Sequence, residues 1–190
     1  MNQYKYWKVI FDFILAVILI LFLMPVLIVL FVVASLDTSS NGIFFQTRIG
    51  QYGKPFTIYK FKTIHDNKRV CSKIGQTLRK FKFDEFPQLF NILKGDMSFV
   101  GPRPDIEGYY DKLAGADRKV LELKPGLTCE ASIKYRDEEN LLNSQENPLE
   151  YNDEILFPNK VKMNLDYYEN MSFKNDTKIL FKTIIRHGFT

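Results

Sequence analysis

The stretch Phe13–Ala34, FILAVILILFLMPVLIVLFVVA, decides the fold, because it runs for 22 residues without a charge. As a helix rising about 1.5 Å per residue, it would extend for about 33 Å, enough to cross the hydrocarbon core of a bilayer. The run exceeds the apolar core of a cleaved signal peptide, and no small-x-small cleavage site follows it. We therefore predict a membrane-anchoring segment in residues 1–37.

Pro25 lies near the middle of this run and would remove a helical hydrogen bond and bend the helix. Basic residues flank the run on both sides: Lys5 and Lys8 before it, and Arg48, Lys54, Lys60 and Lys62 after it. By the positive-inside rule, both ends prefer the cytoplasm. A helix that enters, breaks at Pro25 and returns satisfies both observations. A single span with a proline kink is the alternative, and the residues alone leave both open.

Charge is distributed unevenly over the rest of the chain. Residues 38–136 carry 18 Lys or Arg against 10 Asp or Glu, whereas residues 137–190 carry 6 against 10. The basic section would attract phosphates, lipid headgroups or nucleic acid. The two cysteines, Cys71 and Cys129, suggest neither a disulfide framework nor a zinc site.

Short elements are predicted after the apolar run, which makes the chain an α+β protein. Residues 43–48 and 56–63 alternate as two strands around a hairpin loop at 50–55. Helices are predicted over 74–83, from a start near 84–87 to a stop at Gly95, and over 177–187. The last helix is basic and amphipathic, so it would lie at a membrane interface or pack on its own core. Residues 106–123 are predicted to be helical with loops and 124–128 to form a turn, and 137–160 receive no assignment.

Candidate catalytic residues are concentrated in the block 83–104, FDEFPQLFNILKGDMSFVGPRP. The acidic pair Asp84-Glu85 lies near its start. Neighbouring helical residues point about 100° apart, so one carboxylate can face a substrate while the other orients it, takes a proton or binds a metal. An Asp carboxylate can attack phosphorus if cations neutralise the phosphate. Mg²⁺ is commonly held by one or two carboxylates with substrate phosphates. The alternative is a pair of solvated charges at a helix start.

The sequence resembles the bacterial sugar transferases, the small monotopic phosphoglycosyl transferases. The resemblance runs through most of the chain: Lys8-x-x-x-Asp12, 45–50, 56–63, Leu78-Arg79, 84–104, 124–128, Tyr167-Tyr168-Glu169-Asn170-x-Ser172 and 178–180.

This resemblance implies transfer of a sugar-1-phosphate from a UDP-sugar to a polyprenyl phosphate such as undecaprenyl phosphate. Asp84 would be the nucleophile that forms a covalent phospho-sugar enzyme, Glu85 would complete the dyad, and UMP would be released. Mg²⁺ is the implied cofactor, held by Asp84 and possibly by Glu85. The candidates for binding substrate and phosphate are Lys60, Lys62, Arg79, Gln88 and Arg103.

The resemblance also implies a place in the cell. A re-entrant helix broken at Pro25 would anchor a catalytic domain, 38–190, with interfacial helices, on the cytoplasmic face of the bacterial inner membrane. Its partners would be the UDP-sugar, the polyprenyl phosphate, membrane lipids and downstream glycosyltransferases that build capsule, exopolysaccharide or O-antigen.

The chain departs from the family pattern at three places, one of which is the acidic stretch 137–160. Met24-Pro25 replaces a common Ser-Pro break, and Cys129-Glu130-Ala131-Ser132 follows Thr128 where many members continue Gly-x-x-Gln. The leading alternative to the transferase is a membrane-anchored, non-catalytic interaction protein. A basic nucleic-acid-binding domain is disfavoured, since no reader motif is present.

Overall fold

The computed structural model describes residues 3–66 and 70–188. Two compact units divide the chain. The first unit takes its residues from Met1–Tyr6, Ile49–Lys54 and Ser98–Thr190, and the second from Trp7–Arg48 and Pro55–Met97. The predicted division into an anchor, 1–37, and a catalytic part, 38–190, concerns function and stays a prediction.

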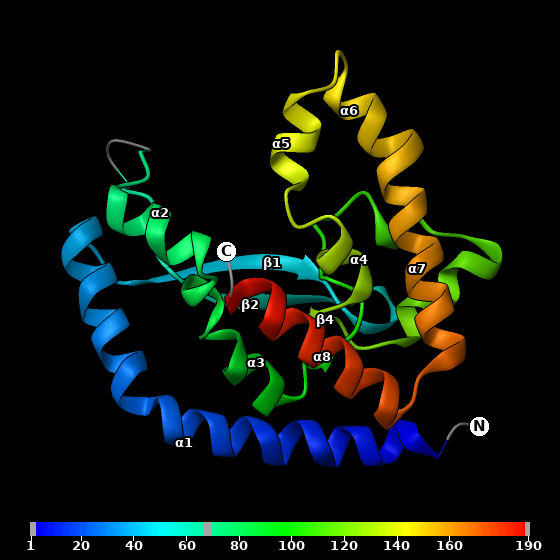
Figure 1. Ribbon diagram of the computed structural model, residues 1–190, viewed down its shortest axis with the longest axis horizontal. Coiled ribbons are helices and arrows are strands. Elements are labelled where there is room, and N and C mark those ends of the chain that lie inside the picture. The colour runs from blue at the N-terminus through cyan, green and yellow to red at the C-terminus, as the bar shows by residue number, and fades with distance from the viewer. Residues whose placement is uncertain (1–2, 67–69, 189–190) are drawn as a thin grey trace. The chain divides into compact units, whose positions relative to one another are not determined.

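The structure mixes helices with short strands, as predicted (Figure 1). In chain order the helices and strands are α1 (Tyr4–Thr38), β1 (Ile43–Ile49), β2 (Pro55–Phe61), α2 (Lys73–Lys80), α3 (Gln88–Lys94), β3 (Ser98–Val100), β4 (Gly126–Thr128), α4 (Glu130–Lys134), α5 (Glu138–Asn143), α6 (Pro148–Tyr151), α7 (Phe157–Asn170) and α8 (Phe173–Gly188). The other helical segments are the 3₁₀ helices η1 (Gln51–Gly53), η2 (Phe83–Glu85), η3 (Tyr110–Lys112) and η4 (Gly115–Glu122), and the π-helix η5 (Asn152–Leu156).

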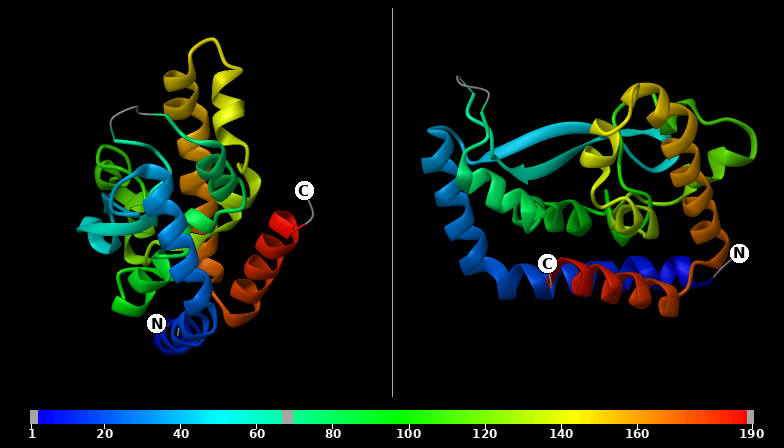
Figure 2. Two further views of the ribbon diagram at one scale, coloured as in Figure 1. Left: turned by 90° about the vertical axis from the view of Figure 1, so that its left-hand side faces the viewer. Right: turned by 45° about the horizontal axis from the view of Figure 1, so that its top comes forward.

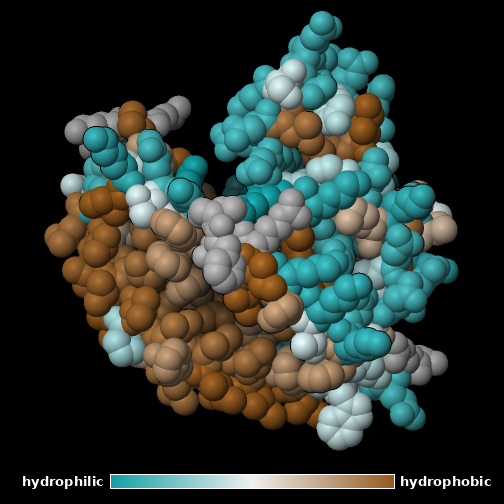
Figure 3. Space-filling view, viewed as in Figure 1, coloured by the Kyte–Doolittle hydropathy of each residue, from teal (hydrophilic) through white to brown (hydrophobic). Residues whose placement is uncertain are grey.

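The predicted long apolar helix is confirmed as α1, which contains Pro25. The ribbon of α1 bends, as a proline inside a helix requires (Figures 1 and 2). Among the described residues, α1 alone is long and apolar enough to cross a membrane, judged by length and composition. Most of its apolar side chains are exposed, and they form a brown surface over α1 in Figure 3.

The arm of α1 after Pro25 packs against the predicted hairpin, which is confirmed as β1 and β2. Leu27, Ala34 and Phe61 form a buried cluster with the partly buried Phe86. At Gly42, a Cβ atom would lie 2.6 Å from the backbone oxygen of Phe31, so a glycine is required for the chain to turn this close to α1. The arm of α1 after Pro25 and the hairpin therefore share one hydrophobic core within the second unit.

The two predicted helices after the hairpin are also present in the second unit. Helix α2 begins at Lys73 behind Ser72, whose side chain accepts a hydrogen bond from the backbone of Gly75. Helix α3 ends at Gly95, which adopts a φ of 82° and confirms the predicted stop. Its start lies at Gln88, because the preceding residues 83–85 form the separate turn η2.

A parallel strand pair organises the first unit and corrects one prediction. Residues 124–128 were expected to form a turn, but Gly126–Thr128 is the strand β4, with Ser98 opposite Gly126 and Val100 opposite Thr128. A Cβ atom on Gly126 would collide with the backbone of Gly101, and a Cβ atom on Gly101 would collide with the carbonyl oxygen of Lys124, so both glycines permit this close approach. The local sequence reads as a turn because its pairing partner lies far away in the chain.

The remaining predictions for the first unit concern helices. Residues 106–123 form the 3₁₀ turns η3 and η4 with loops between them. The unassigned segment 137–160 contains α5, α6, η5 and the start of α7. The C-terminal helix is confirmed, and it begins at Phe173, earlier than the pattern indicated. The first unit has a buried hydrophobic cluster of its own, formed by Ile49, Tyr110, Val120, Leu121 and Val161.

Candidate active site

The acidic pair lies in the short turn η2, directly before α3 in the second unit. Asp84 and Glu85 are both buried, with 7% and 6% of their surface exposed. Lys82, immediately before the turn, has a φ of 58°, a left-handed conformation that residues other than glycine rarely adopt. The pair is therefore a buried feature on a sharply turned backbone, and it is not the solvated helix start that the sequence left as an alternative.

Glu85 is held by a cation from the neighbouring strand. The Lys60 Nζ atom donates a hydrogen bond to Glu85 Oε1 at 3.1 Å, with side-chain exposures of 20% and 8%. Side chains alternate along a strand, so Lys60 points away from the face that carries Tyr59 and Phe61. The ion pair joins β2 to η2 and fixes Glu85 next to Asp84.

Asp84 has an oxygen that the fold leaves free. Among the residues that the structure describes, no hydrogen-bond partner reaches the buried Asp84 Oδ1. Burial, and next the negative charge of Glu85, raise the pKa of Asp84 above its ordinary value of 3.8, while Lys60, Lys82 and Arg79 act to lower that pKa. A buried carboxylate oxygen without a donor costs free energy, which makes Asp84 a candidate for a functional role.

Arg79 is positioned at the end of α2 by a contact with the loop after β2. Its Nε atom donates to Thr63 Oγ1 at 2.8 Å. The start of α2 is also tied down, since Ser72 Oγ donates to Asp37 Oδ2 at 2.6 Å. Because Asp37 lies near the end of α1, this bond links the anchor helix to the helix that carries Arg79.

Asn91 is a site-supporting residue that the sequence analysis missed. Its side chain is fully buried in α3, where Nδ2 donates to the Thr57 carbonyl at 2.7 Å and Oδ1 accepts from the Tyr59 amide at 3.1 Å. The amide thus bonds the edge of β2 as another strand would, beside Lys60. A polar residue inside the apolar pattern of residues 89–93 was the signal that could have identified it.

The other predicted residues have different surroundings. Lys62 pairs with Asp66, four residues later. Gln88 is buried at the first position of α3, three residues after Glu85. Arg103 is half-buried and belongs to the first unit, where it follows β3. Within the second unit, the structure thus brings Asp84, Glu85, Lys60 and Arg79 together. Lys62 instead forms an ion pair with Asp66.

The residues present fit a magnesium ion better than a softer metal. Within the described residues, no three His, Cys, Asp or Glu side chains gather into a metal-binding group. Mg²⁺ does not need such a group, since one or two carboxylates and the phosphates of a substrate suffice. The unbonded Asp84 Oδ1 would be an oxygen ligand of the kind that Mg²⁺ prefers.

The arrangement can attack or bind phosphate. It offers a buried carboxylate oxygen without a donor, a second carboxylate held by Lys60, and further positive charge from Arg79 and Lys82. Cations near a carboxylate keep it ionised and offset the charge of an incoming phosphate, both of which nucleophilic attack on phosphorus requires.

Comparison with known proteins yields one consistent group. The sequence model described as "Bacterial sugar transferase" matches residues 3–189. The uncharacterized sugar transferase EpsL of Bacillus subtilis is 36% identical over 140 residues, covering 68% of this chain and 69% of its own. The UDP-glucose:undecaprenyl-phosphate glucose-1-phosphate transferase of Escherichia coli is 34% identical over 155 residues, covering 73% of this chain.

A third relative is named for N-acetylgalactosamine, whereas the Escherichia coli relative is named for glucose. The UDP-N-acetylgalactosamine-undecaprenyl-phosphate N-acetylgalactosaminephosphotransferase of Aeromonas hydrophila is 33% identical over 121 residues, covering 57% of this chain. The matches span only 33% of the Escherichia coli protein and 28% of the Aeromonas hydrophila protein, so this chain corresponds to about a third of those longer relatives.

Proposed function

This chain belongs to the bacterial sugar transferase family, and on that premise we propose that it transfers a sugar-1-phosphate from a UDP-sugar to undecaprenyl phosphate. The observation that carries the proposal is the buried Asp84 Oδ1, which no described residue bonds. The donors and acceptor named for the relatives support the substrate class.

The reaction proceeds in two displacements. An oxygen of ionised Asp84 attacks the phosphorus that carries the sugar, and the bond from that phosphorus to the bridging oxygen breaks, so the electron pair leaves with UMP. A phosphate oxygen of undecaprenyl phosphate then attacks the same phosphorus. The bond to Asp84 breaks, which restores the carboxylate and releases undecaprenyl diphosphate-sugar. Splitting the transfer in this way replaces one difficult step by two easier ones.

The cations around the dyad assist both displacements. Lys60 holds Glu85 and lowers the pKa of Asp84, so a larger fraction of Asp84 is ionised. Arg79, oriented by Thr63, and Lys82 add positive charge toward the incoming diphosphate. Glu85, held by Lys60, would fix the η2 backbone and in this way orient the neighbouring Asp84. We keep Lys62, Gln88 and Arg103 as proposed contacts for the remaining phosphate and nucleotide groups.

Asp84, with Glu85 beside it, would hold Mg²⁺ together with the phosphates of the donor. When bound, the ion neutralises charge on the diphosphate and on the departing UMP. The fit rests on hard oxygen ligands and on the unbonded Asp84 oxygen.

The anchor places the reaction at the lipid headgroups. We propose that α1 is re-entrant, with its break at Pro25, and that the dyad lies on the cytoplasmic face of the inner membrane. The bend of α1 and the basic residues on both flanks support this arrangement. Exposed Phe173, Phe181 and Ile184 on α8 support an interfacial position for that helix as well. A shallow anchor reduces the search for the acceptor to the membrane plane.

The product would begin the assembly of a bacterial polysaccharide. A lipid diphosphate-sugar is a substrate for glycosyltransferases that extend the chain, so capsule, exopolysaccharide and O-antigen pathways all accommodate this step. The sugar is decided by pocket shape, and the relatives' names include both glucose and N-acetylgalactosamine.

Product analysis tests the proposal. The purified protein in nanodiscs receives a panel of UDP-sugars with undecaprenyl phosphate, and the nucleotide products are separated. We expect UMP, formed with one preferred sugar, lost in EDTA and restored by Mg²⁺. Release of UDP would indicate transfer of the sugar alone and contradict the proposal. Full activity in EDTA would remove only the role of the metal.

A further inference from the structure

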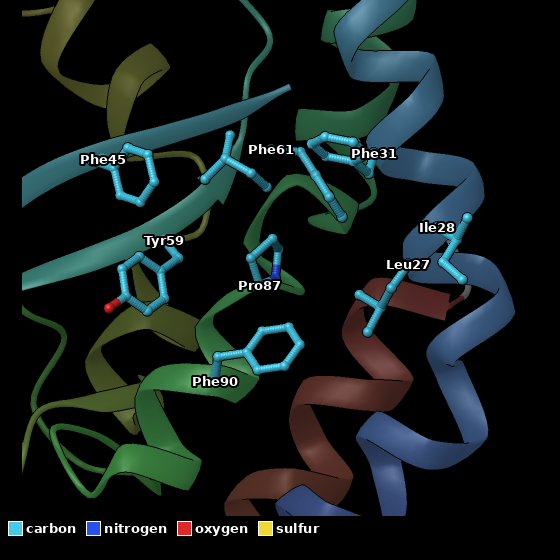
Figure 4. Close-up of a pocket in the computed structure, with 9 residues that line it drawn as sticks. Leu27, Ile28, Phe31, Phe45, Tyr59, Phe61, Pro87 and Phe90 are labelled. Carbon is cyan, nitrogen blue, oxygen red and sulfur yellow. The ribbon is translucent and has the colours of Figure 1, made fainter. Parts of the chain in front are cut away.

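An apolar groove of about 480 Å³ lies in the second unit (Figure 4), and neither Asp84 nor Glu85 lines it. Three parts of the chain line it: the arm of α1 after Pro25, the β1–β2 hairpin, and the first turn of α3 with the Pro87 that precedes it. Figure 4 shows the side chains that the argument uses, namely Leu27, Phe31, Phe45, Tyr59, Pro87 and Phe90.

The groove exposes aromatic surface that water solvates poorly. Phe45 is 57% exposed, Phe31 40% and Phe90 38%, although all three belong to well-formed elements. Covering such side chains with an apolar partner is favourable in proportion to the area removed from water. Contiguous exposed apolar surface of this kind marks a binding site for a lipid, a ligand or another protein.

The geometry points to this groove as the site that receives the isoprenoid chain of the polyprenyl phosphate acceptor, an inference that rests on the proposed function. One wall of the groove is α1, whose lining residues Ile28 and Phe31 are also exposed, so the groove is continuous with the apolar surface of α1. Its other end includes Pro87, two residues after Glu85. One short segment thus joins the groove to the carboxylates that would attack the phosphorus.

The two faces of β2 would contact different parts of the acceptor, one its isoprenoid chain and the other its phosphate. Tyr59 and Phe61 line the groove, whereas Lys60 between them turns to Glu85 on the other face. An acceptor whose phosphate reaches the dyad must therefore pass Pro87 before its chain enters the groove. The volume lies within the roughly 300–1,000 Å³ of pockets for small ligands, so the groove holds several isoprene units of a long chain.

This arrangement predicts that the groove distinguishes long acceptors from short ones. A short prenyl phosphate can present its phosphate to the dyad without occupying the groove, but a long chain gains affinity from it. Substitutions in the groove should therefore weaken only the long acceptor. They should leave the reaction with the UDP-sugar unchanged, because the donor carries no such chain.

Phe45→Ala and Phe90→Ala test the inference, with Phe44→Ala as the matched control. Phe44 is the neighbouring strand residue, 42% exposed, and does not line the groove. The acceptors are undecaprenyl phosphate and dimethylallyl phosphate, a single isoprene unit, assayed in nanodiscs of fixed lipid composition. We expect KM for undecaprenyl phosphate to rise about tenfold in either groove variant, as the lost apolar contact implies, and KM for dimethylallyl phosphate to stay within about twofold.

Equal changes for both acceptors, or none, would overturn the groove assignment. UMP release from the UDP-sugar without acceptor, measured in the same variants, separates this failure from failure of the proposed function. If wild-type protein transfers nothing to either acceptor, the proposed function fails instead.

Photo-crosslinking of the wild-type protein avoids dependence on the folding of variants. A polyprenyl phosphate with a diazirine on its chain should label peptides that contain Phe45 or Phe90, and excess undecaprenyl phosphate should suppress the labelling. Phosphatidylglycerol with a diazirine on an acyl chain should label them weakly. Strong labelling by that phospholipid, unaffected by undecaprenyl phosphate, would assign the groove to bulk lipid and contradict the inference.

Discussion

Asp84 and Asp176 are two buried aspartates in different units, and their surroundings are opposite. Asp176 in α8 is 2% exposed, and both its oxygens accept hydroxyl hydrogen bonds, from Tyr4 at 2.7 Å and from Tyr167 at 2.6 Å. Asp84 is 7% exposed, and its Oδ1 has no hydrogen-bond partner among the described residues.

The difference separates a carboxylate that the fold holds from the carboxylate that we propose to be reactive. Hydrogen bonds to both oxygens stabilise the Asp176 side chain and leave it little capacity to react. The Asp84 oxygen remains available, and the nearby Lys60, Lys82 and Arg79 favour its ionised form. Burial alone therefore does not identify a catalytic aspartate, and the unbonded oxygen among cations is what makes Asp84 the nucleophile that we propose.

Replacement of the free carboxylate should have the largest effect. In Asp84→Asn, UMP release should fall by at least about 10⁴-fold, because a neutral amide cannot attack phosphorus. Kinetics of UMP release measure the loss, and circular dichroism checks that the variant folds. Activity within tenfold of wild type would contradict the nucleophile assignment.

The same variant should not be less stable in chelator at neutral pH. Because burial raises the pKa of Asp84, the native state binds this proton more tightly than the unfolded chain. Wild-type stability therefore falls as pH rises from about 3.8 through the raised pKa, and asparagine removes this cost. A melting temperature clearly below that of wild type would show that Asp84 stabilises the fold.

Asp176→Asn should show the reverse pattern. The amide nitrogen cannot accept a tyrosine hydroxyl, so unfolding should become easier by about 1–3 kcal/mol, while kcat of the folded protein changes by less than about threefold. Denaturant unfolding and initial rates measure the two quantities. Tyr167→Phe should also destabilise, and Tyr168→Phe serves as the matched control, since Tyr168 bonds Glu122 with its side chain partly exposed.

Lys60→Met should make the reactive aspartate harder to ionise. Lys60 lowers the pKa of Asp84, so its removal should move the acidic limb of the kcat profile to higher pH. At neutral pH the rate should fall by about 10- to 100-fold. Lys94→Met is the control, because Lys94 pairs with Asp96 and has no place in the proposed site. An unshifted acidic limb in Lys60→Met would exclude this electrostatic role.

Thr63→Val should have the smallest effect. It removes the hydrogen bond that orients Arg79 but keeps the shape of the side chain. We expect KM for the UDP-sugar to rise by about three- to tenfold, in line with one lost hydrogen bond. The variant Thr77→Val controls for loss of a hydroxyl, since Thr77 bonds only its own helix at Lys73. Equal KM values in the two variants would show that orientation of Arg79 does not matter.

Features set by neighbouring residues could be predicted from the sequence. The apolar run with Pro25, the alternating strands around the hairpin and the glycine stop at Gly95 were predicted from local patterns, and the structure confirms them. The acidic pair was also identified locally. Its 3₁₀ turn was not, because Lys82 adopts a left-handed conformation that no lysine pattern indicates.

Features set by distant residues could not be predicted. Strand β4 reads as a turn until Ser98 and Val100 lie opposite it. The pairing of Lys60 with Glu85 depends on which strand face meets η2. Asn91 has its role only because the edge of β2 lies against α3. A sequence identifies the reacting residue types, but the partner of each charge depends on tertiary packing.

Mass spectrometry of the protein incubated with Mg²⁺ and its UDP-sugar, without acceptor, tests the central claim most directly. The account predicts an adduct with the mass of the sugar-phosphate on the peptide that carries Asp84, and its disappearance when undecaprenyl phosphate is added. An unmodified protein that still transfers the sugar-phosphate once the acceptor is present, or an adduct on another residue, would contradict it.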